Sequence, residues 1–157
     1  MRIGFGYDVH TLESGYELVL GGVNIPFEKG CVAHSDGDVL IHALWDALLG
    51  AAAMGDIGKH YPDTDPAYKN IASTTLLKKT MHLIQTQGYR VVNVDSTICL
   101  QRPKLSPYME EMKQILSELT HTSAISIKAT TAEKLGFVGQ EKGIAAYAVV
   151  LLDSGNF

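Results

Sequence analysis

Apolar residues recur at intervals of three and four in three stretches of the chain, a spacing that predicts amphipathic helices. The first helix is predicted from about Gly37 to Ala53, the second from about Asn70 to Gln87, and the third from Ser106 to about Thr120. Gly55 ends the first pattern and Gly88 follows the second, where a glycine commonly closes a helix. Three helices are therefore expected.

Two of the predicted helices begin at residues that commonly cap a helix N-terminus. Ser35, with Asp38 three residues later, forms a variant of the capping box for the first helix. Ser106 precedes Pro107, and proline is favoured in the first helical turn, so Ser106 is the predicted N-cap of the third helix. Both helices are therefore expected to begin with a serine cap.

Alternating apolar and polar positions predict strands in other segments. The predicted strands are Arg2 to His10, Tyr16 to Leu20, Val91 to Gln101, Ala124 to Ala129, and Gly143 to Leu152. On the third of these, one face is expected to carry Val92, Val94, Ser96, Ile98 and Leu100. Polar sequence rich in turn-forming residues predicts loops at Gly30 to Asp38 and at Asp56 to Pro66.

The order of these elements indicates a mixed α/β (α+β) fold. Between about 91 and 129, a strand, a helix and a strand follow one another, a crossover that favours a sheet covered by helices on one side. No repeat, linker or low-complexity segment divides the chain. Residues 1–157 are therefore expected to form a single domain.

Composition and charge narrow the classes of function. The chain has 157 residues, of which 46% are hydrophobic and 19% charged, as is typical of globular proteins. Its net charge of −4 argues against a nucleic-acid partner. Two cysteines make no disulfide framework, and the sequence predicts neither a signal peptide nor a membrane span. A cytoplasmic protein without a membrane partner is expected.

Asp8, His10 and His42 could meet at one metal ion. Residues two apart on a strand point to the same face, so Asp8 and His10 can converge. His42 lies within an apolar helix, where a polar side chain needs a partner. One carboxylate and two imidazoles would form a three-ligand site with an open position, as in catalytic zinc sites.

Other arrangements of these residues remain open. Asp38 and His42 are four apart on the predicted helix and face the same way, so a hydrogen bond between them could simply support the helix. Beside a metal, Asp38 or Asp46 could instead orient a ligand histidine. Asp8 alone could fix a turn beside a hydrogen-bonded His10.

Three further polar segments could bind an anion or a metal. The three acidic groups between Asp56 and Asp65 could bind a diol or a metal, or form Asx turns. The segment from Lys128 to Phe137 offers two hydroxyls and a carboxylate to a phosphate or a metal, although Thr-x-x-Glu is also a capping pattern. The basic element from Gln101 to Lys104 could hold an anion or a nucleotide, or form a solvated turn.

Five motifs follow one another along the chain: Asp-Val-His (8–10), His-Ser-Asp-Gly-Asp (34–38), Gly-Asp-Ile-Gly (55–58), Tyr-Pro-Asp-Thr-Asp (61–65) and Ala-Thr-Thr-Ala-Glu-Lys-Leu-Gly-Phe (129–137). Together and in this order, they resemble the 2-C-methyl-D-erythritol 2,4-cyclodiphosphate synthase family of the non-mevalonate isoprenoid pathway. The resemblance covers nearly the whole chain and implies a homotrimer of ferredoxin-like subunits with active sites between neighbours. The implied enzyme is a phosphorus–oxygen lyase that converts 4-diphosphocytidyl-2-C-methyl-D-erythritol 2-phosphate to the cyclodiphosphate and CMP.

The resemblance also implies roles for individual residues. Asp8, His10 and His42 match the ligands of one divalent metal, usually zinc. Glu133 matches a ligand of a second cation, Mg²⁺ or Mn²⁺, that binds with the substrate diphosphate. His34 and Thr131 match catalytic positions that stabilise the transition state.

Substrate contacts are implied in two parts of the chain. In the first part, Asp56, Gly58 and Asp63 match the loop that holds the methylerythritol part. Substrate contacts there are also implied for Asp8, Val9, His10, His34, Ser35, Ile57, Tyr61, Pro62, Thr64 and Asp65. Contacts with the cytidine diphosphate part are implied for Leu100, Gln101, Arg102, Pro103, Lys104, Leu105, Ser106, Thr130, Thr131, Ala132 and Glu133. Phe137 and Gln140 complete the implied set.

One position departs from the family pattern. Many members carry an arginine that faces phosphate and the cavity on the threefold axis, whereas this chain has Gln140. Because glutamine lacks the positive charge of arginine, we do not expect this cavity to bind an isoprenoid diphosphate. Lys142 could replace part of the missing charge.

Two other functions fit the same residues. In a zinc hydrolase of a nucleotide diphosphate, the open metal position would activate water. In a metal-stabilised binding module, the metal would instead be closed by four ligands.

Overall fold

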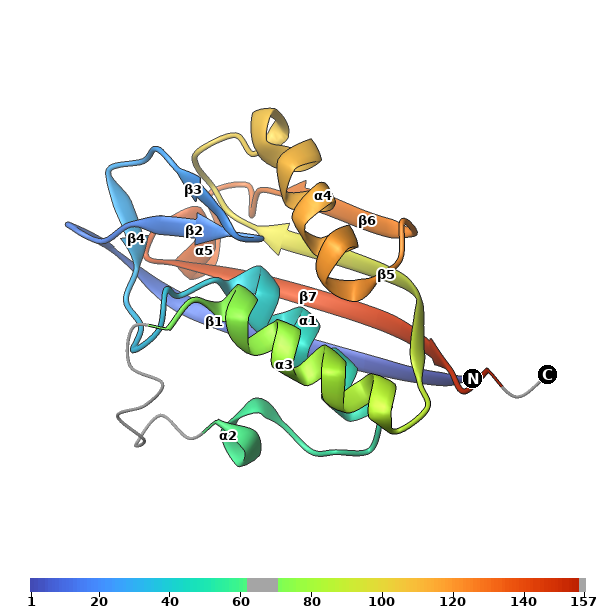
Figure 1. Ribbon diagram of the computed structural model, residues 1–157. Coiled ribbons are helices and arrows are strands. Elements are labelled where there is room, and N and C mark those ends of the chain that lie inside the picture. The colour runs from blue at the N-terminus through green and yellow to red at the C-terminus, as the bar shows by residue number, and fades with distance from the viewer. Residues whose placement is uncertain (62–70, 156–157) are drawn as a thin grey trace.

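Five strands form the main sheet, in the spatial order β4-β1-β7-β5-β6 (Figure 1). The computed structural model describes residues 1–61 and 71–155 of the chain. The strands are β4 (Lys29–Cys31), β1 (Arg2–Ser14), β7 (Gly143–Asp153), β5 (Arg90–Cys99) and β6 (Ile125–Thr130). β5 and β6 run parallel, as the predicted crossover requires, and the other neighbouring strands run antiparallel.

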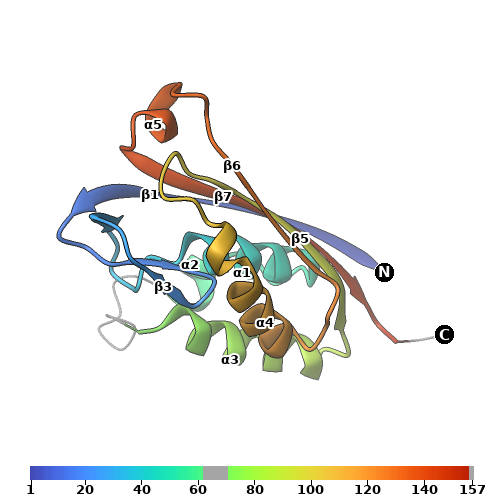
Figure 2. The same ribbon diagram turned by 90° about the horizontal axis from the view of Figure 1, so that it is seen from above.

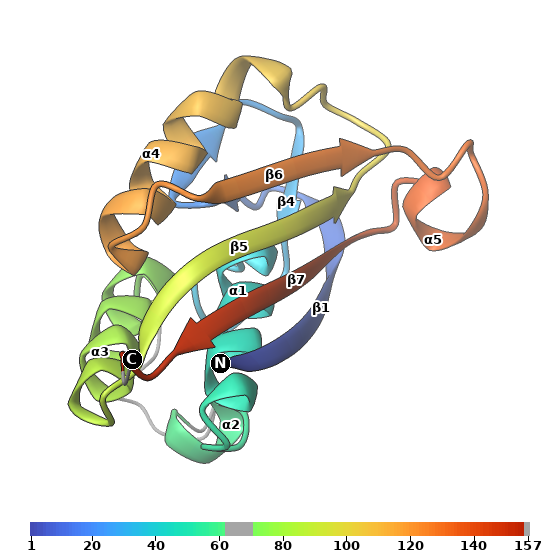
Figure 3. The same cartoon turned by 90° about the vertical axis from the view of Figure 1, so that its right-hand side faces the viewer.

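The long helices lie on one face of this sheet (Figure 2). They are α1 (Val39–Ala51), α3 (Ser73–Thr86) and α4 (Met109–Thr120). β2 (Leu18–Leu20) and β3 (Val23–Ile25) form a separate two-stranded ribbon. The short helix α2 (Ile57–His60) follows α1, and α5 (Gly136–Gly139) lies at the end of the sheet where β6 ends and β7 begins (Figure 3). The mixed α/β class and the one-sided helix cover are confirmed.

α1 occupies the centre of the core. It packs against β1 and β7 on one side and against α3 on another, so most of its residues are buried. The predicted apolar face of this helix is fully inside: Leu40, Leu44, Ala47, Leu48 and Ala51. Within residues 1–61 and 71–155, no helix is both long enough and apolar enough to cross a membrane.

Two glycines on β1 bring the backbone of α1 close to the sheet. A Cβ atom at Gly4 would overlap the carbonyl oxygen of Ala47, and one at Gly6 would overlap that of Ala43. Only a residue without a side chain can occupy these positions at this separation. Because the next residues of β1 on the same face carry the candidate chemistry, this close packing sets their distance from α1.

Asp38, and not Ser35, caps the N-terminus of α1. The buried Asp38 carboxylate accepts hydrogen bonds from Ile41 N at 3.0 Å, Gly21 N at 2.9 Å and Gly22 N at 2.7 Å. The prediction of a Ser35 cap was wrong because only the carboxylate next to the helix reaches these three amides. The helix accordingly begins at Val39.

The serine cap predicted for the third helix is also wrong. A 3₁₀ turn over Ser106–Tyr108 precedes α4, and its N-cap is Leu105, which makes no side-chain capping bond. Pro107 lies in the first turn of this 3₁₀ segment, where its missing N–H costs little. The predicted end of the helix at Thr120 is confirmed.

Three other local predictions need correction. Val92 is exposed rather than buried because a β-bulge between Val91 and Asn93 shifts the register of β5 against β7. Gly30 and Cys31 belong to β4 instead of a loop because they pair with the end of β1. The predicted loop from 56 contains the helix α2, whose N-cap Asp56 accepts a hydrogen bond from Lys59 N.

Candidate metal centre

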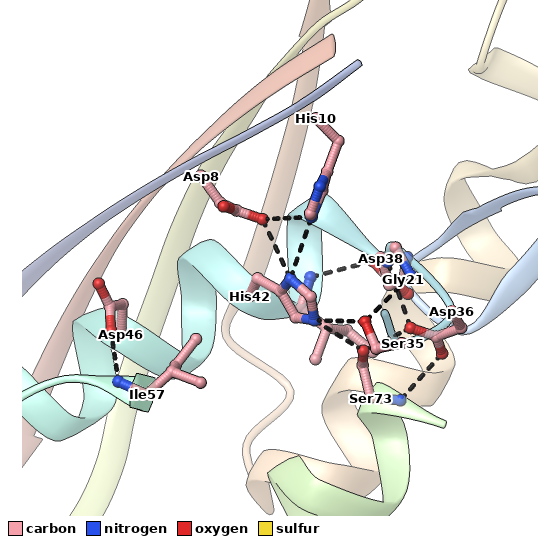
Figure 4. Close-up of polar contacts among 12 residues, drawn as sticks. Asp8, His10, Gly21, Ser35, Asp36, Asp38, His42, Asp46, Ile57 and Ser73 are labelled. Atoms are coloured by element: carbon pink, nitrogen blue, oxygen red, sulfur yellow. Dashed lines mark hydrogen bonds and ion pairs between the residues drawn. The ribbon is translucent and has the colours of Figure 1, made fainter. Parts of the chain in front are cut away.

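Asp8, His10 and His42 converge on one point (Figure 4). Asp8 Oδ2 lies 3.0 Å from His10 Nε2 and 3.1 Å from His42 Nδ1. The two imidazole nitrogens are 3.2 Å apart. Asp8 and His10 come from the helix-facing side of β1, and His42 from the side of α1 that packs on it. The structure therefore brings together Asp8 and His10 from a strand and His42 from a helix, as predicted.

Within this cluster, hydrogen bonds and charge interactions together outweigh the effect of burial on the pKa values of Asp8 and His42. Burial alone would raise the pKa of Asp8, but hydrogen bonds and charge interactions with His10 and His42 lower it to about 2. Burial alone would lower the pKa of His42, but the hydrogen bond and charge of Asp8, with the charges of Asp38 and Asp36, raise it above its ordinary value. Asp8 and His42 thus favour each other's charged forms, and a metal bound at the cluster would compete with the proton of His42.

The donor atoms fit a small divalent cation. Ligand atoms about 2.0–2.1 Å from a tetrahedral zinc lie about 3.3 Å from one another. The three donor atoms here are 3.0–3.2 Å apart. One carboxylate oxygen and two imidazole nitrogens leave a fourth position for a further ligand. Partial exposure of all three side chains, between 15% and 26%, leaves that position accessible. The cluster could therefore hold a metal with an open place.

A second set of contacts lies behind the His42 ring. Ser73 Oγ is 2.9 Å from His42 Nε2, and Ser35 Oγ is 3.4 Å from the same nitrogen. Asp36 in turn accepts hydrogen bonds from both the hydroxyl and the backbone N–H of Ser73. The only sequence signal for this contact was the position of Asp36 in the His-Ser-Asp-Gly-Asp motif. No local pattern indicates a role for Ser73. Sequence reasoning therefore missed both residues.

Asp38 and Asp46 do not orient His42 in the ways considered above. The Asp38 carboxylate is directed to backbone amides, and Asp46 accepts a hydrogen bond from Ile57 N at 3.0 Å. The contact between Asp38 and His42 is the ordinary helical bond from His42 N to the Asp38 carbonyl. The carboxylates of Asp38 and Asp46 thus accept hydrogen bonds from backbone amides near the cluster and not from the His42 ring.

Residues 1–153 match the sequence model of the YgbB family. The chain belongs to the YgbB family. A relative from Syntrophobacter fumaroxidans, named 2-C-methyl-D-erythritol 2,4-cyclodiphosphate synthase, is 54% identical over 98% of both chains. The resemblance found in the five motifs is therefore confirmed.

Solved structures support the same assignment. A structure described as 2C-methyl-D-erythritol-2,4-cyclodiphosphate synthase in a CDP-bound form is 41% identical, with a TM-score of 0.89 over 97% of this chain and 100% of that one. The bifunctional IspDF from Campylobacter jejuni is 42% identical, with a TM-score of 0.92 over 96% of this chain. The chain spans 42% of the length of that longer protein.

Two other candidate residues of this YgbB-family chain, Thr131 and Glu133, follow β6 and lie away from the triad. β6 is three strands from β1 in the sheet, a separation of about 14 Å. Just after β6, Thr131 Oγ1 donates a hydrogen bond to Glu133 Oε1 at 2.9 Å. Because of this separation, Glu133 does not join Asp8, His10 and His42 within the described chain. Glu133 and Lys134 both adopt left-handed backbone conformations, with φ of 50° and 64°.

Arg102 connects three loops beside the predicted nucleotide site. Its guanidinium forms two hydrogen bonds with Glu141, at 2.7 and 2.9 Å, and one with Glu28 at 2.7 Å. The guanidinium also lies 5.3 Å from the centre of the Phe27 ring. A phosphate would have to compete with both carboxylates for this side chain. Nearby, Gln101 Oε1 accepts a hydrogen bond from Lys134 N at 3.4 Å.

The other residues predicted to contact the substrate differ in how far they are exposed to solvent. His34, Gly58 and Gln140 are exposed, whereas Leu100 and Leu105 are buried in the core. Tyr61 packs against Trp45, with ring centres 4.8 Å apart. The predicted contacts Pro62, Asp63, Thr64 and Asp65 lie outside the described residues.

Proposed function

We propose that this chain is a 2-C-methyl-D-erythritol 2,4-cyclodiphosphate synthase that forms the cyclodiphosphate and CMP from 4-diphosphocytidyl-2-C-methyl-D-erythritol 2-phosphate. The observation that carries the proposal is the cluster of Asp8, His10 and His42, whose donor set leaves a position for a substrate phosphate. Relatives that carry this enzyme name share 53–57% of their residues with the chain.

The reaction needs charge stabilisation and positioning more than a side-chain nucleophile. An oxygen of the 2-phosphate forms a bond to the β-phosphorus, while the bond from that phosphorus to the bridging oxygen breaks. The bridging oxygen keeps the electron pair and leaves as part of CMP, which makes the enzyme a phosphorus–oxygen lyase. The attacking phosphate is ionised near neutral pH, so no general base is required. Repulsion between anionic groups is the main obstacle.

Two cation positions are part of the proposal. Asp8, His10 and His42 would hold zinc, and the Glu133 carboxylate would hold Mg²⁺ or Mn²⁺ with the diphosphate. Divalent cations supply Lewis-acid stabilisation of the charge on the transferring phosphoryl group. The exposed His34 ring can donate a hydrogen bond to a phosphoryl oxygen in the transition state. The Thr131 hydroxyl would do the same by exchanging its hydrogen bond to Glu133 for one to the substrate.

The substrate would bind across two regions. Ile57 N donates a hydrogen bond to Asp46, which lies about one helical turn after His42 on α1. Residues 56–58 would therefore be placed to hold the methylerythritol part. The loops at 100–106 and 130–133 lie together at one end of the sheet and would hold the cytidine diphosphate part. CDP is the ligand in a solved structure that is 41% identical to this chain.

A homotrimer would bring these two regions together. Within one chain, about 14 Å of sheet separates the strand of Asp8 from the strand that leads to Glu133. The sheet face opposite the helices exposes large apolar side chains, which favours contact with another copy. These side chains are Ile3, Phe5, Tyr7, Val9, Tyr147 and Val149. A neighbouring subunit would then provide Thr131 and Glu133 to the triad.

The cytoplasm is the proposed location. Cys31 and Cys99 are both free, as is usual for proteins in a reducing compartment.

The decisive experiment identifies the products. Purified protein is incubated with the cytidylyl substrate, Zn²⁺ and Mg²⁺, and the products are followed by phosphorus NMR and mass spectrometry. Equal amounts of cyclic diphosphate and CMP are expected. Linear products that contain an added water would instead assign a nucleotide diphosphate hydrolase. Absence of turnover together with a closed, four-coordinate metal would assign a binding module.

A further inference from the structure

Ser73 links the candidate metal ligand His42 to a carboxylate. Its hydroxyl oxygen lies 2.9 Å from His42 Nε2 and 2.5 Å from Asp36 Oδ1 (Figure 4). Its backbone N–H donates a hydrogen bond to Asp36 Oδ2 at 2.9 Å. Ser73 is fully buried, so its hydroxyl depends on these two protein partners.

The chemistry of the three groups gives this chain of hydrogen bonds a direction. An ionised carboxylate accepts hydrogen bonds and donates none. The single hydroxyl hydrogen of Ser73 is therefore donated to Asp36. The hydroxyl oxygen then has lone pairs to accept a hydrogen bond from His42, which requires a proton on Nε2. Nδ1, which lies 3.1 Å from Asp8 Oδ2 and 3.2 Å from His10 Nε2, is then free to bind a cation.

We infer that Ser73 and Asp36 are positioning residues that hold His42 in the Nε2–H form, with Nδ1 directed at the metal. This inference rests on the metal site of the proposed function. Partners of this kind behind a histidine ligand fix both its tautomer and the orientation of its ring. Ser35 is the weaker acceptor, because its hydroxyl is 3.4 Å from Nε2 and also accepts a hydrogen bond from Gly37 N.

The backbone around Ser73 keeps this geometry in place. Ser73 is the first residue of α3, and the N-cap residue Ala72 has no side chain that could cap the helix. Asp36 supplies the missing acceptor from the loop before α1. The same carboxylate accepts a hydrogen bond from Asp38 N at 3.2 Å. Asp36 thus joins the starts of α3 and α1, the helix that carries His42.

Two substitutions interrupt the chain of hydrogen bonds in different ways. Ser73→Ala removes the acceptor for the Nε2 proton. Asp36→Asn keeps the shape, but its amide can donate to Ser73, which frees the hydroxyl hydrogen for His42 Nε2 and favours the proton on Nδ1. Ser96→Ala is the matched control because Ser96 is also a buried serine, and its hydroxyl donates to the Ser126 carbonyl far from the triad.

The test measures zinc affinity by competition with a chromogenic chelator, without substrate. Both Ser73→Ala and Asp36→Asn are expected to bind zinc about 10–100-fold more weakly, and Ser96→Ala is expected to bind it normally. In zinc-loaded wild-type protein labelled with ¹⁵N-histidine, NMR should place the His42 proton on Nε2 and show slow exchange with water. The loss of that slow exchange in Ser73→Ala is expected.

Zinc affinity equal to wild type in both variants would overturn the inference, as would a zinc-loaded spectrum with the His42 proton on Nδ1. Asp36→Asn preserves the size and shape of the side chain. If Ser73→Ala fails to fold, the zinc affinity of Asp36→Asn alone therefore decides the result. Wild-type protein that binds no zinc would refute the metal site and the inference together. Wild-type protein that binds zinc and shows the expected NMR signals, but forms no cyclic product, would refute only the proposed reaction.

Discussion

His42 Nδ1 lies 3.1 Å from Asp8 Oδ2, although 34 residues separate the two along the chain. This contact joins the core helix α1 to the strand β1, and Gly6 allows the two backbones to approach closely enough for it to form. The candidate chemistry and the packing of the core therefore depend on the same helix–strand contact.

His42→Ala should abolish tight zinc binding and most synthase activity. A three-ligand site reduced to two ligands holds zinc poorly, so we expect affinity to fall by more than about 100-fold. The single tryptophan, Trp45, offers a direct measurement because its ring centre lies 6.3 Å from that of His42. Quenching of its fluorescence by Co²⁺ should disappear. His82→Ala is the control because it removes an exposed histidine on α3. Full metal occupancy in His42→Ala would contradict the ligand assignment.

Glu133→Gln should spare the metal of the triad but slow catalysis. Glu133 follows β6, away from Asp8, and its proposed partner is the cation bound with the diphosphate. We expect a loss of about 100-fold in turnover, equivalent to about 2.7 kcal/mol, with unchanged zinc content. Steady-state kinetics at several Mg²⁺ concentrations and elemental analysis measure the two effects. Glu110→Gln on the exposed surface of α4 is the control. Loss of zinc from Glu133→Gln would refute this division of the ligands.

Gly6→Ala should disturb the metal site without touching a ligand. The added Cβ would overlap the Ala43 carbonyl oxygen, so α1 must move away from β1 and carry His42 with it. Overpacking of this kind costs about 1–3 kcal/mol, and zinc affinity should fall as well. Urea unfolding and chelator competition measure these effects. Gly50→Ala is the matched control because a Cβ there meets no atom within 4 Å. That substitution should be neutral or stabilise α1 by up to about 1 kcal/mol.

The stability of the zinc-free protein should depend on pH through Asp8 and His42. The folded pKa of Asp8 is lowered to about 2, so its contribution is present above about pH 3.8 and is lost as the pH falls toward 2. The folded pKa of His42 is raised, so its contribution is present below its ordinary value of about 6.5 and is lost as the pH rises through the raised value.

Asp8→Asn should therefore destabilise the zinc-free protein most between about pH 4 and 6.5, by about 2 kcal/mol. The difference from wild type should shrink on both sides of that range. Chemical unfolding at a series of pH values in the presence of a chelator provides the measurement. A difference that does not vary with pH would show that the ion pair does not form.

Phe5→Glu should separate metal binding from catalysis. Phe5 is 63% exposed on the sheet face opposite the helices, where a buried charge would prevent the proposed contact between subunits. Sedimentation should show smaller particles than wild type. Zinc affinity should remain, because one chain supplies the whole triad, but synthase activity should fall sharply. Leu83→Glu is the control, since Leu83 is exposed on a helix instead. Full activity in monomeric Phe5→Glu would refute the intersubunit site.

Part of the candidate site could be predicted because it depends on local periodicity. Asp8 and His10 are two residues apart on a strand, so their side chains point to one face in any regular strand. The apolar faces of the helices followed from the same reasoning. The place of His42 within an apolar helix suggested it as the third ligand. The order of the motifs then identified the family and gave all three residues the same role.

The sequence by itself determined the order and type of the main elements, because spacing along a helix or a strand dictates which side chains share a face. Only the tertiary structure decided which elements meet. The Asp38 carboxylate, which caps α1, also binds glycine amides 16 and 17 residues away. Ser73 contacts His42 across 31 residues. It also decided that β6 ends far from Asp8. Such contacts depend on how packed elements lie in space, and no short stretch of sequence contains that information.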